Sequence, residues 1–104
     1  MTKIISIAID AMGGDDSPDK IIKGIKIFLD INKSKNDFRL NIFGREDQIK
    51  NHLKKYDINS DLIKIFDTKN FVSDNEKPLT AVKNSKNTSM WNCIQHQLEG
   101  KSDI

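Results

Sequence analysis

A short apolar run at residues 4–9, Ile-Ile-Ser-Ile-Ala-Ile, constrains the fold of this chain more than any other feature. The run is nearly continuous and rich in β-branched residues, which is typical of a strand of a parallel sheet that is buried on both faces. It ends at Asp10 and is followed by a loop that contains Gly13 and Gly14. Glycines permit backbone angles that other residues avoid, so we expect a tight turn after the strand.

The turn leads into a predicted helix. Ser17 is suited to cap it, Pro18 suits the first helical position, and Asp19 favours the positive end of the helix dipole. Apolar residues then repeat at helical spacing between Ile21 and Leu29. The same alternation continues with expected strands at residues 38–43 and 62–66, a helix at residues 45–55, a short helical segment from Pro78, and a helix that starts at Thr88 or Ser89 and stops near Gly100.

This alternation of strands and helices predicts an α/β fold, a three-layer α/β/α arrangement around a mainly parallel, Rossmann-like sheet. The strand at residues 4–9 should lie in the interior of the sheet, between the strands at residues 38–43 and 62–66. Asp103 and Ile104 resemble the first residues of a fourth strand. The 104 residues are therefore expected to form one truncated α/β domain rather than two domains.

Composition and charge exclude several classes of protein. The 17 basic and 15 acidic residues give a net charge of +2, and the lysines are scattered among acids, whereas nucleic-acid binders usually carry a clustered basic surface. The single cysteine, Cys93, rules out an internal disulfide and fits a reducing compartment. No apolar stretch is long enough for a secretory signal or a membrane span, so we expect a cytoplasmic protein. From the scattered charges we expect that it binds no nucleic acid.

Residues 10–16, the glycine loop, are the first candidate ligand site. The loop follows a predicted buried strand, at the edge where open α/β sheets bind their ligands, and free amide groups of the next helix lie nearby. It lacks the third glycine of a dinucleotide fingerprint and the Gly-Lys-Ser/Thr of a Walker loop. Its aspartates disfavour direct phosphate contact, so a tight turn with solvated acids is an alternative that these residues leave open.

Residues 77–90 are the second candidate. The segment combines lysines and hydroxyl side chains, among them Lys86 and Ser89, with a predicted helix start. Such a combination can hold an anion through charge, hydroxyl groups and amide dipoles. A solvated connector with ordinary helix capping at Ser89 explains the same residues, and this alternative also stays open.

Cys93 and His96 have a spacing that occurs in metal sites, but two ligands do not make a zinc site and the sequence has no second pair. We expect Cys93 to pack as a small apolar residue on its helix. His52 and His96 should be partly exposed helix residues. No metal site is predicted.

Two blocks of sequence go further than composition. Residues 7–15 read Ile-Ala-Ile-Asp-Ala-Met-Gly-Gly-Asp, and residues 77–90 contain Lys77, Pro78, Ala81, Lys86, Ser89 and Met90. The first block resembles the opening signature of the PlsX family, the acyl-carrier-protein:phosphate acyltransferases. The second resembles a later segment of that family in the expected order, and residues 42–44 resemble its second strand. The resemblance covers essentially the whole chain.

The chain departs from the family pattern at several positions. Asp16 stands where many members carry Asn, Lys83 stands where Arg is usual, and Asn84 and Ser85 replace basic residues. Lysine lacks the bidentate fork of arginine, so anion binding at this segment should be weaker or rearranged. Family members also continue beyond the position of Ile104, so residues 1–104 would be the amino-terminal part of a single acyltransferase domain.

The resemblance implies an enzyme that transfers an acyl group from acyl carrier protein to inorganic phosphate, giving acyl phosphate for phospholipid biosynthesis. It implies these two substrates as partners, a homodimer in the complete family member, and peripheral membrane association through parts absent from this chain. It implies no cofactor or metal and assigns no catalytic residue. For substrate binding it points to Gly13 and Gly14 for close backbone approach, Lys86 and Ser89 for anion contact, and Asp10 for orienting the loop or a positive group.

A non-catalytic function is the alternative. The chain by itself supplies at most three complete strands, so we expect it to be inactive alone. It would then be a catalytically inactive fragment, or an interaction module without enzymatic activity that keeps the fold.

Overall fold

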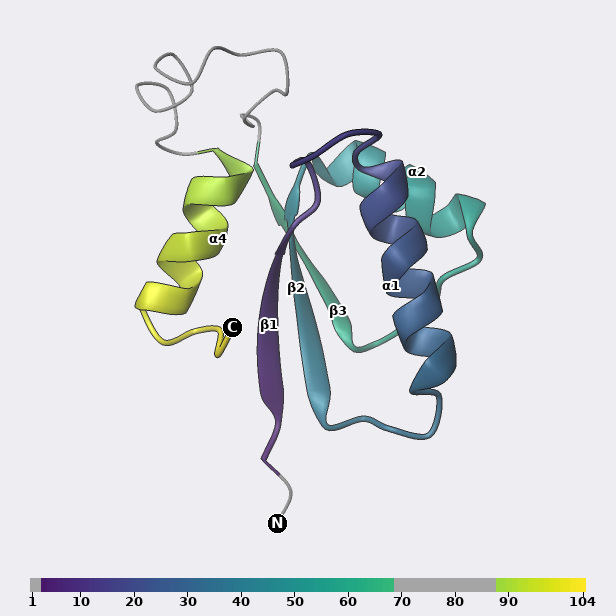
Figure 1. Cartoon of the computed structure of the whole chain (residues 1–104), viewed down its shortest axis with the longest axis horizontal. Helices are drawn as coiled ribbons and strands as arrows, with labels where there is room; N and C mark the ends of the chain where they lie inside the picture. Colours follow the sequence, from purple (N-terminus) through teal and green to yellow (C-terminus); the bar gives the residue numbers. More distant parts are fainter. Residues whose placement is uncertain (1–2, 69–87) are drawn as a thin grey trace.

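The computed structural model describes residues 3–68 and 88–104 of the chain. These residues form a parallel three-stranded sheet with helices on both faces (Figure 1). The elements follow in the order β1 (Ile5–Asp10), α1 (Asp19–Ile31), β2 (Phe38–Gly44), α2 (Glu46–Lys55), β3 (Ile63–Asp67) and α4 (Ser89–Leu98). The predicted α/β fold is confirmed, and the segment expected from Pro78 lies outside the described residues.

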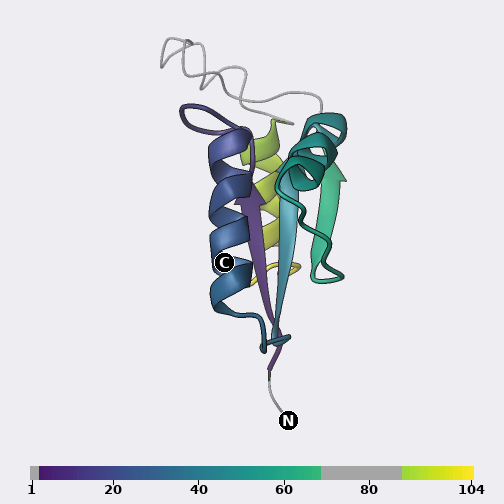
Figure 2. The ribbon, with the colours of Figure 1, turned by 90° about the vertical axis from the view of Figure 1, so that its right-hand side faces the viewer.

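The helices form two outer layers. α1 and α2 lie on one face of the sheet and α4 lies on the other, as the two perpendicular views show (Figures 1 and 2). Side chains of β2 alternate between these layers: Leu40 joins the core beneath α1 and α2, whereas Asn41 hydrogen-bonds to Ser102 on the α4 side. The three-layer prediction is therefore confirmed. No helix within residues 3–68 and 88–104 is long and apolar enough to cross a membrane.

The order of the strands differs from the prediction. β2 is the central strand, and its Leu40 pairs with Ile7 of β1 on one side and Ile63 of β3 on the other. The expectation that residues 4–9 lie between the other two strands is wrong. So is the expectation of burial on both faces, because Ile5 is 41% exposed and the rest of β1 is half-buried. Each strand reads as a short apolar run, and such a run does not specify its neighbours.

The helix ends agree with the prediction in part. Thr88 caps α4, because its Oγ1 accepts a hydrogen bond from a backbone amide of the first turn at 3.1 Å. Ser17 does not cap α1: Pro18 occupies the cap position, and the Ser17 hydroxyl donates to the carbonyl of Gly13, which closes the preceding loop. Gly100 follows the end of α4 with a φ of +77°, so the predicted stop is confirmed.

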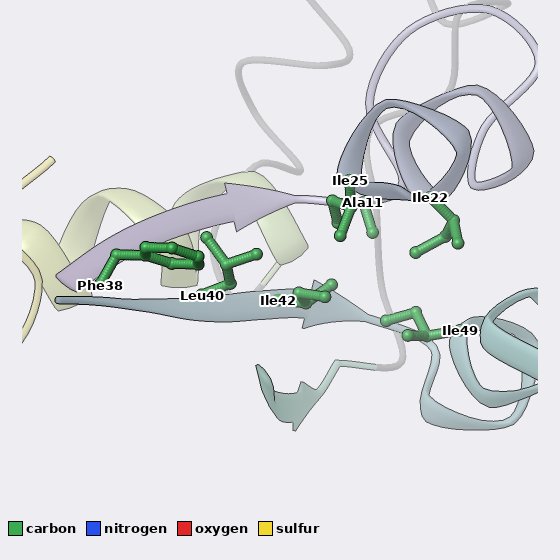
Figure 3. Close-up of a cluster of buried hydrophobic side chains, with 7 residues drawn as sticks. All are labelled: Ala11, Ile22, Ile25, Phe38, Leu40, Ile42 and Ile49. Carbon is green, nitrogen blue, oxygen red and sulfur yellow. The ribbon is translucent and has the colours of Figure 1, made fainter. Parts of the chain in front are cut away.

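The core lies between the sheet and the helices α1 and α2 (Figure 3). Its buried members are hydrophobic: Ala11, Ile22, Ile25, Phe38, Leu40, Ile42 and Ile49. Burial of each Leu, Ile or Phe side chain stabilises the fold by about 1.5–3 kcal/mol relative to exposure. Ile22 from α1 and Ile49 from α2 both reach the carboxyl end of β2, so this core holds the two helices over that end of the sheet.

The last residues of the chain run beside β1, at the edge opposite to β2. The amide of Ala8 donates to the carbonyl of Ile104 at 2.7 Å. The amide of Asp103 donates to the carbonyl of Ser6, also at 2.7 Å. These hydrogen bonds put Asp103 and Ile104 at the edge of β1, although the two residues do not themselves form a strand.

Candidate functional site

The carboxyl ends of the strands form a rim at which the glycine loop meets residues 88–90, the described part of the second candidate segment. β1 ends at Asp10, and α4 begins at Ser89. The hydroxyl of Ser89 donates to Oδ1 of Asp10 at 2.7 Å, although the two residues are 79 positions apart. Ser89 is fully buried at this contact. The start of α4 therefore lies directly against the glycine loop, as expected for motifs that share one rim of a parallel sheet.

Asp10 organises the glycine loop. Its Oδ1 also accepts a hydrogen bond from the amide of Met12 at 3.0 Å. Its Oδ2 fills the space beside Gly13, where an added Cβ would stand only 2.7 Å away. Gly14 has a φ of +84°, a left-handed conformation that favours glycine. The geometry of the loop thus requires glycine at both positions, for a steric reason at the first and a conformational reason at the second.

The three helices of the described residues all begin at this rim (Figure 1). Their positive dipole ends therefore point toward it, an arrangement that attracts anions. The positive dipole end of α2 already has one acidic partner, because the amide of Glu46, the first residue of α2, donates a hydrogen bond to Oδ1 of Asp67 at 3.0 Å. Lys86, the predicted anion contact, lies outside the described residues. Among residues 3–68 and 88–104, no three or more His, Cys, Asp or Glu side chains gather into a group that could hold a metal ion.

Cys93 is a partly buried residue of α4. Burial, and secondarily the negative charge of Asp10, raise the pKa of its thiol to about 11. The side chain therefore stays a neutral thiol at physiological pH and is not an activated nucleophile. This agrees with the expectation that Cys93 packs as a small apolar residue.

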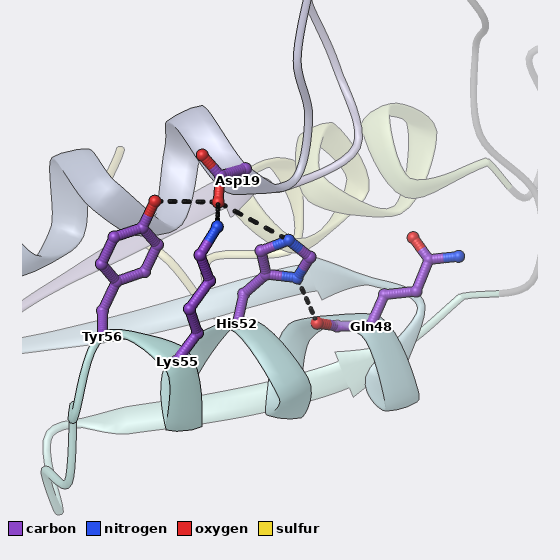
Figure 4. A network of polar contacts seen from close by, with 5 residues as sticks. All are labelled: Asp19, Gln48, His52, Lys55 and Tyr56. Atoms are coloured by element: carbon purple, nitrogen blue, oxygen red, sulfur yellow. Dashed lines mark hydrogen bonds and ion pairs between the residues drawn. The ribbon is translucent and has the colours of Figure 1, made fainter.

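A polar cluster joins the first turn of α1 to the end of α2 (Figure 4). Oδ1 of Asp19 accepts hydrogen bonds from Nζ of Lys55 and from the hydroxyl of Tyr56, each at 2.8 Å, and Nε2 of His52 lies 3.7 Å from it. Two hydrogen bonds lower the pKa of Asp19: the one from Lys55 contributes most, and the one from Tyr56 contributes next. The cluster fixes the start of α1, and with it the exit of the glycine loop, against α2.

Another network anchors the far end of α4 to β2. Nδ2 of Asn41 donates to Oγ of Ser102 at 3.0 Å, and this oxygen lies 2.6 Å from Nδ1 of His96. Burial, with a further contribution from the positive charge of Lys101, lowers the pKa of His96. The Nδ1 atom of a neutral imidazole can accept a hydrogen bond from the Ser102 hydroxyl. Since it lies at the opposite end of α4 from Ser89, this network is separate from the rim.

The sequence pattern of the family described as "Fatty acid synthesis protein" matches residues 5–104. The chain belongs to this family. A protein of Pelagibacter ubique named phosphate acyltransferase is 45% identical over 104 residues, which is all of this chain and 30% of the relative. Proteins of the same name from Clostridium acetobutylicum and Ehrlichia canis are 37% and 39% identical, over 93% and 88% of this chain and 28% and 27% of their own lengths. The chain therefore spans about 30% of the length of these curated relatives, and the predicted family is confirmed.

The structure brings together four of the five residues that the sequence indicates: Asp10, Gly13, Gly14 and Ser89. Their role in substrate binding stays a prediction. The sequence did not indicate which side chains contact one another, because no local pattern connects Ser89 to Asp10. For the cluster around Asp19, the sequence contains one indication, which is an acidic residue in the first turn of a predicted helix. That signal predicts an interaction with the helix dipole and not the side-chain partners on α2.

Proposed function

We propose that this chain forms part of the phosphate site of an acyltransferase that moves an acyl group from the thioester of acyl carrier protein to inorganic phosphate. The product is an acyl phosphate that supplies phospholipid biosynthesis. The contact between Ser89 and Asp10 carries the proposal, because it brings the start of α4 against the end of β1 and its glycine loop. The relatives named phosphate acyltransferase support the reaction class.

The reaction places defined demands on this site. A phosphate oxygen attacks the thioester carbon, the C–S bond breaks, and the carrier thiolate leaves and takes up a proton. Phosphate is the nucleophile, so the protein has to hold and desolvate it and stabilise the developing oxyanion. We assign the backbone at Gly13 and Gly14 to close approach of the phosphate and Lys86 to its charge. A neutral Cys93 beside the site is compatible with a reaction that needs no protein nucleophile.

Other properties are proposed for the complete protein, since the chain spans about 30% of its relatives. We assign to it a cytoplasmic location, a homodimeric state and peripheral association with the membrane. The 104-residue chain alone should not catalyse the transfer at a useful rate. Its described residues form a sheet of three strands, so we expect other segments of the complete protein to supply most walls of a cleft that excludes water.

The role of Lys86 tests the proposed site. In a complete acyltransferase that carries this segment, Lys86→Ala should raise the phosphate concentration needed for half-maximal rate by about tenfold or more, because a charge-assisted contact is lost. The dependence on acyl carrier protein should not change. Lys101→Ala is the matched control, since Lys101 pairs with Glu99 at 3.0 Å at the far end of α4. Equal effects of Lys86→Ala on both substrates would indicate damage to folding and contradict the assignment.

The activity of the chain alone is tested directly. Purified 104-residue protein is incubated with acyl carrier thioester and phosphate, and acyl phosphate is measured. We expect no turnover from a folded, monodisperse sample. Both non-catalytic alternatives, the inactive fragment and the interaction module, predict the same result. Phosphate-dependent turnover comparable to that of a full-length relative would contradict the proposed incompleteness of the cleft.

A further inference from the structure

The burial of Ser89 limits what its hydroxyl can do. The residue is 0% exposed, and its hydroxyl proton is directed to Oδ1 of Asp10 at 2.7 Å. A serine hydroxyl carries one proton, so the group cannot donate to a phosphate while it donates to Asp10. This geometry gives Ser89 a role that differs from direct contact with an anion.

Asp10 is occupied in a similar way. Its Oδ1 accepts hydrogen bonds from the Met12 amide at 3.0 Å and from the Ser89 hydroxyl, and its Oδ2 lies against Gly13. A carboxylate that touched a phosphate would repel it, because both groups are negative. Here the carboxylate instead contacts the backbone of its own loop and the first residue of α4.

We infer that Ser89 and Asp10 form a latch that positions the glycine loop for phosphate, with Ser89 acting as a positioning residue on the loop through Asp10. The latch consists of the Ser89 hydroxyl, the Asp10 carboxylate and the Met12 amide. The inference rests on the proposed function, because it states how the second motif acts on the first. Since the latch joins the end of β1 to the start of α4, it ties the position of the glycine loop to that of α4.

The latch requires an acceptor oxygen at position 10, but it does not require that this oxygen carry a negative charge. Asp10→Asn keeps such an oxygen, whereas Asp10→Ala removes it. In NMR titrations of the Gly13 and Gly14 amides of the 104-residue chain with inorganic phosphate, Asp10→Asn should bind within about threefold of the unchanged chain. Asp10→Ala and Ser89→Ala should each bind about 5- to 10-fold more weakly. The double variant should be no weaker than the weaker single variant, because both changes remove the same bond.

Ser102→Ala is the matched control. Ser102 is 2% exposed, and its hydroxyl contacts Asn41 and His96 at the far end of α4. We expect this variant and Ser89→Ala both to lose stability, because each loses a buried hydroxyl group, but only the Ser102→Ala variant should keep its phosphate affinity. The latch is overturned if Asp10→Asn binds as weakly as Asp10→Ala, if the two single losses add in the double variant, or if Ser89→Ala binds phosphate as the unchanged chain does.

Hydrogen exchange separates failure of the latch from failure of the proposed function. Without phosphate, exchange of the Met12 amide reports its bond to Asp10. We expect exchange about fivefold faster in Ser89→Ala and unchanged in Asp10→Asn. If the unchanged chain binds no phosphate while these rates hold, the 104 residues do not form a phosphate site by themselves, and the latch stands as a device that orders the loop. If Met12 exchange does not respond to Ser89→Ala, the latch is wrong.

Discussion

Gly13 and Gly24 differ in the space around their α-carbons. A Cβ added at Gly13 would stand 2.7 Å from Oδ2 of Asp10. A Cβ added at Gly24, in the middle of α1, would meet no atom of residues 3–68 and 88–104 within 4 Å. The carboxylate of Asp10 cannot move away without loss of its hydrogen bonds to Met12 and Ser89. The glycine at position 13 is therefore required by its neighbour and not by its own backbone angles.

We predict that Gly13→Ala lowers the free energy of unfolding by about 1–3 kcal/mol, because a methyl group is forced against the carboxylate. Gly24→Ala is the control and should raise this free energy by about 0.5–1 kcal/mol, since alanine is the better helix former and has fewer unfolded conformations to lose. Urea unfolding followed by circular dichroism gives both values. Equal changes in the free energy of unfolding of the two variants would show that the space beside Asp10 can accommodate a methyl group at position 13.

Local signals in the sequence identify residues of the rim but not their contacts. Glycines after an apolar run predict a tight turn, and a threonine before an amphipathic run predicts a cap, as Thr88 confirms. Ser17 has two local uses, capping of α1 or closure of the loop, and the sequence does not rank them. The contact of Ser89 with Asp10 spans 79 positions, so only the folded chain reveals it.

At the scale of helices, the packing of α1 on α2 includes one cluster whose strength depends on pH. Hydrogen bonds from Lys55 and then Tyr56 lower the pKa of Asp19 from its ordinary value of 3.8. A carboxyl group with a depressed pKa stabilises the folded state above its unfolded pKa. That stabilisation is lost as the pH falls through the folded pKa.

We predict that Asp19→Asn lowers the Tm at neutral pH, because the charge that holds Lys55 and Tyr56 is gone. The difference from the unchanged chain should disappear well below pH 3.8, where Asp19 itself is protonated. Asp30→Asn is the control on the same helix and should have little effect, since within the described part of the chain Asp30 makes only an exposed pair with Lys26. Thermal scans over a pH series test this. A difference that persists in acid would mean that Asp19 acts through something other than its charge.

The order of the strands shows where prediction from sequence ends at this scale. The apolar runs of β1 and β2 both predict strands, and both strands form. Right-handed crossovers couple the direction in which the next strand is added to the face that the connecting helix covers. Nothing in the sequence of α1 or α2 specifies that face. The central place of β2 is therefore decided by packing of the whole sheet, which no single run encodes.

At the scale of the molecule, the two helix layers correspond to two directions of growth of the sheet. α1 and α2 lie on one face, and the strands that follow them extend the sheet from β1 through β2 to β3. α4 lies on the other face, and the segment after it returns to the free edge of β1. This reversal is what right-handed crossovers require when a helix changes face. The point of reversal is the rim at which Asp10 and Ser89 meet, and ligands of open α/β sheets bind at such points.

Deletion of residues 103 and 104 tests the pairing at this edge. Without them, the amide of Ala8 loses the carbonyl of Ile104 at 2.7 Å, and the amide of Ser6 loses Oδ2 of Asp103 at 2.8 Å. We predict that both amides exchange with solvent about fivefold faster in the shortened chain, because each loses its hydrogen-bond acceptor. Native-state hydrogen exchange followed by NMR measures the two rates.

The amide of Leu40 is the internal control. It donates to the carbonyl of Leu62 at 2.8 Å, on the β3 side of the central strand, so its exchange should not change on deletion. An unpaired strand edge also recruits other chains, and sedimentation velocity should therefore show more self-association of the shortened protein. Faster exchange at Leu40 as well would indicate general loosening of the sheet. Unchanged exchange at Ser6 and Ala8 would show that the terminal segment does not pair with β1 in solution.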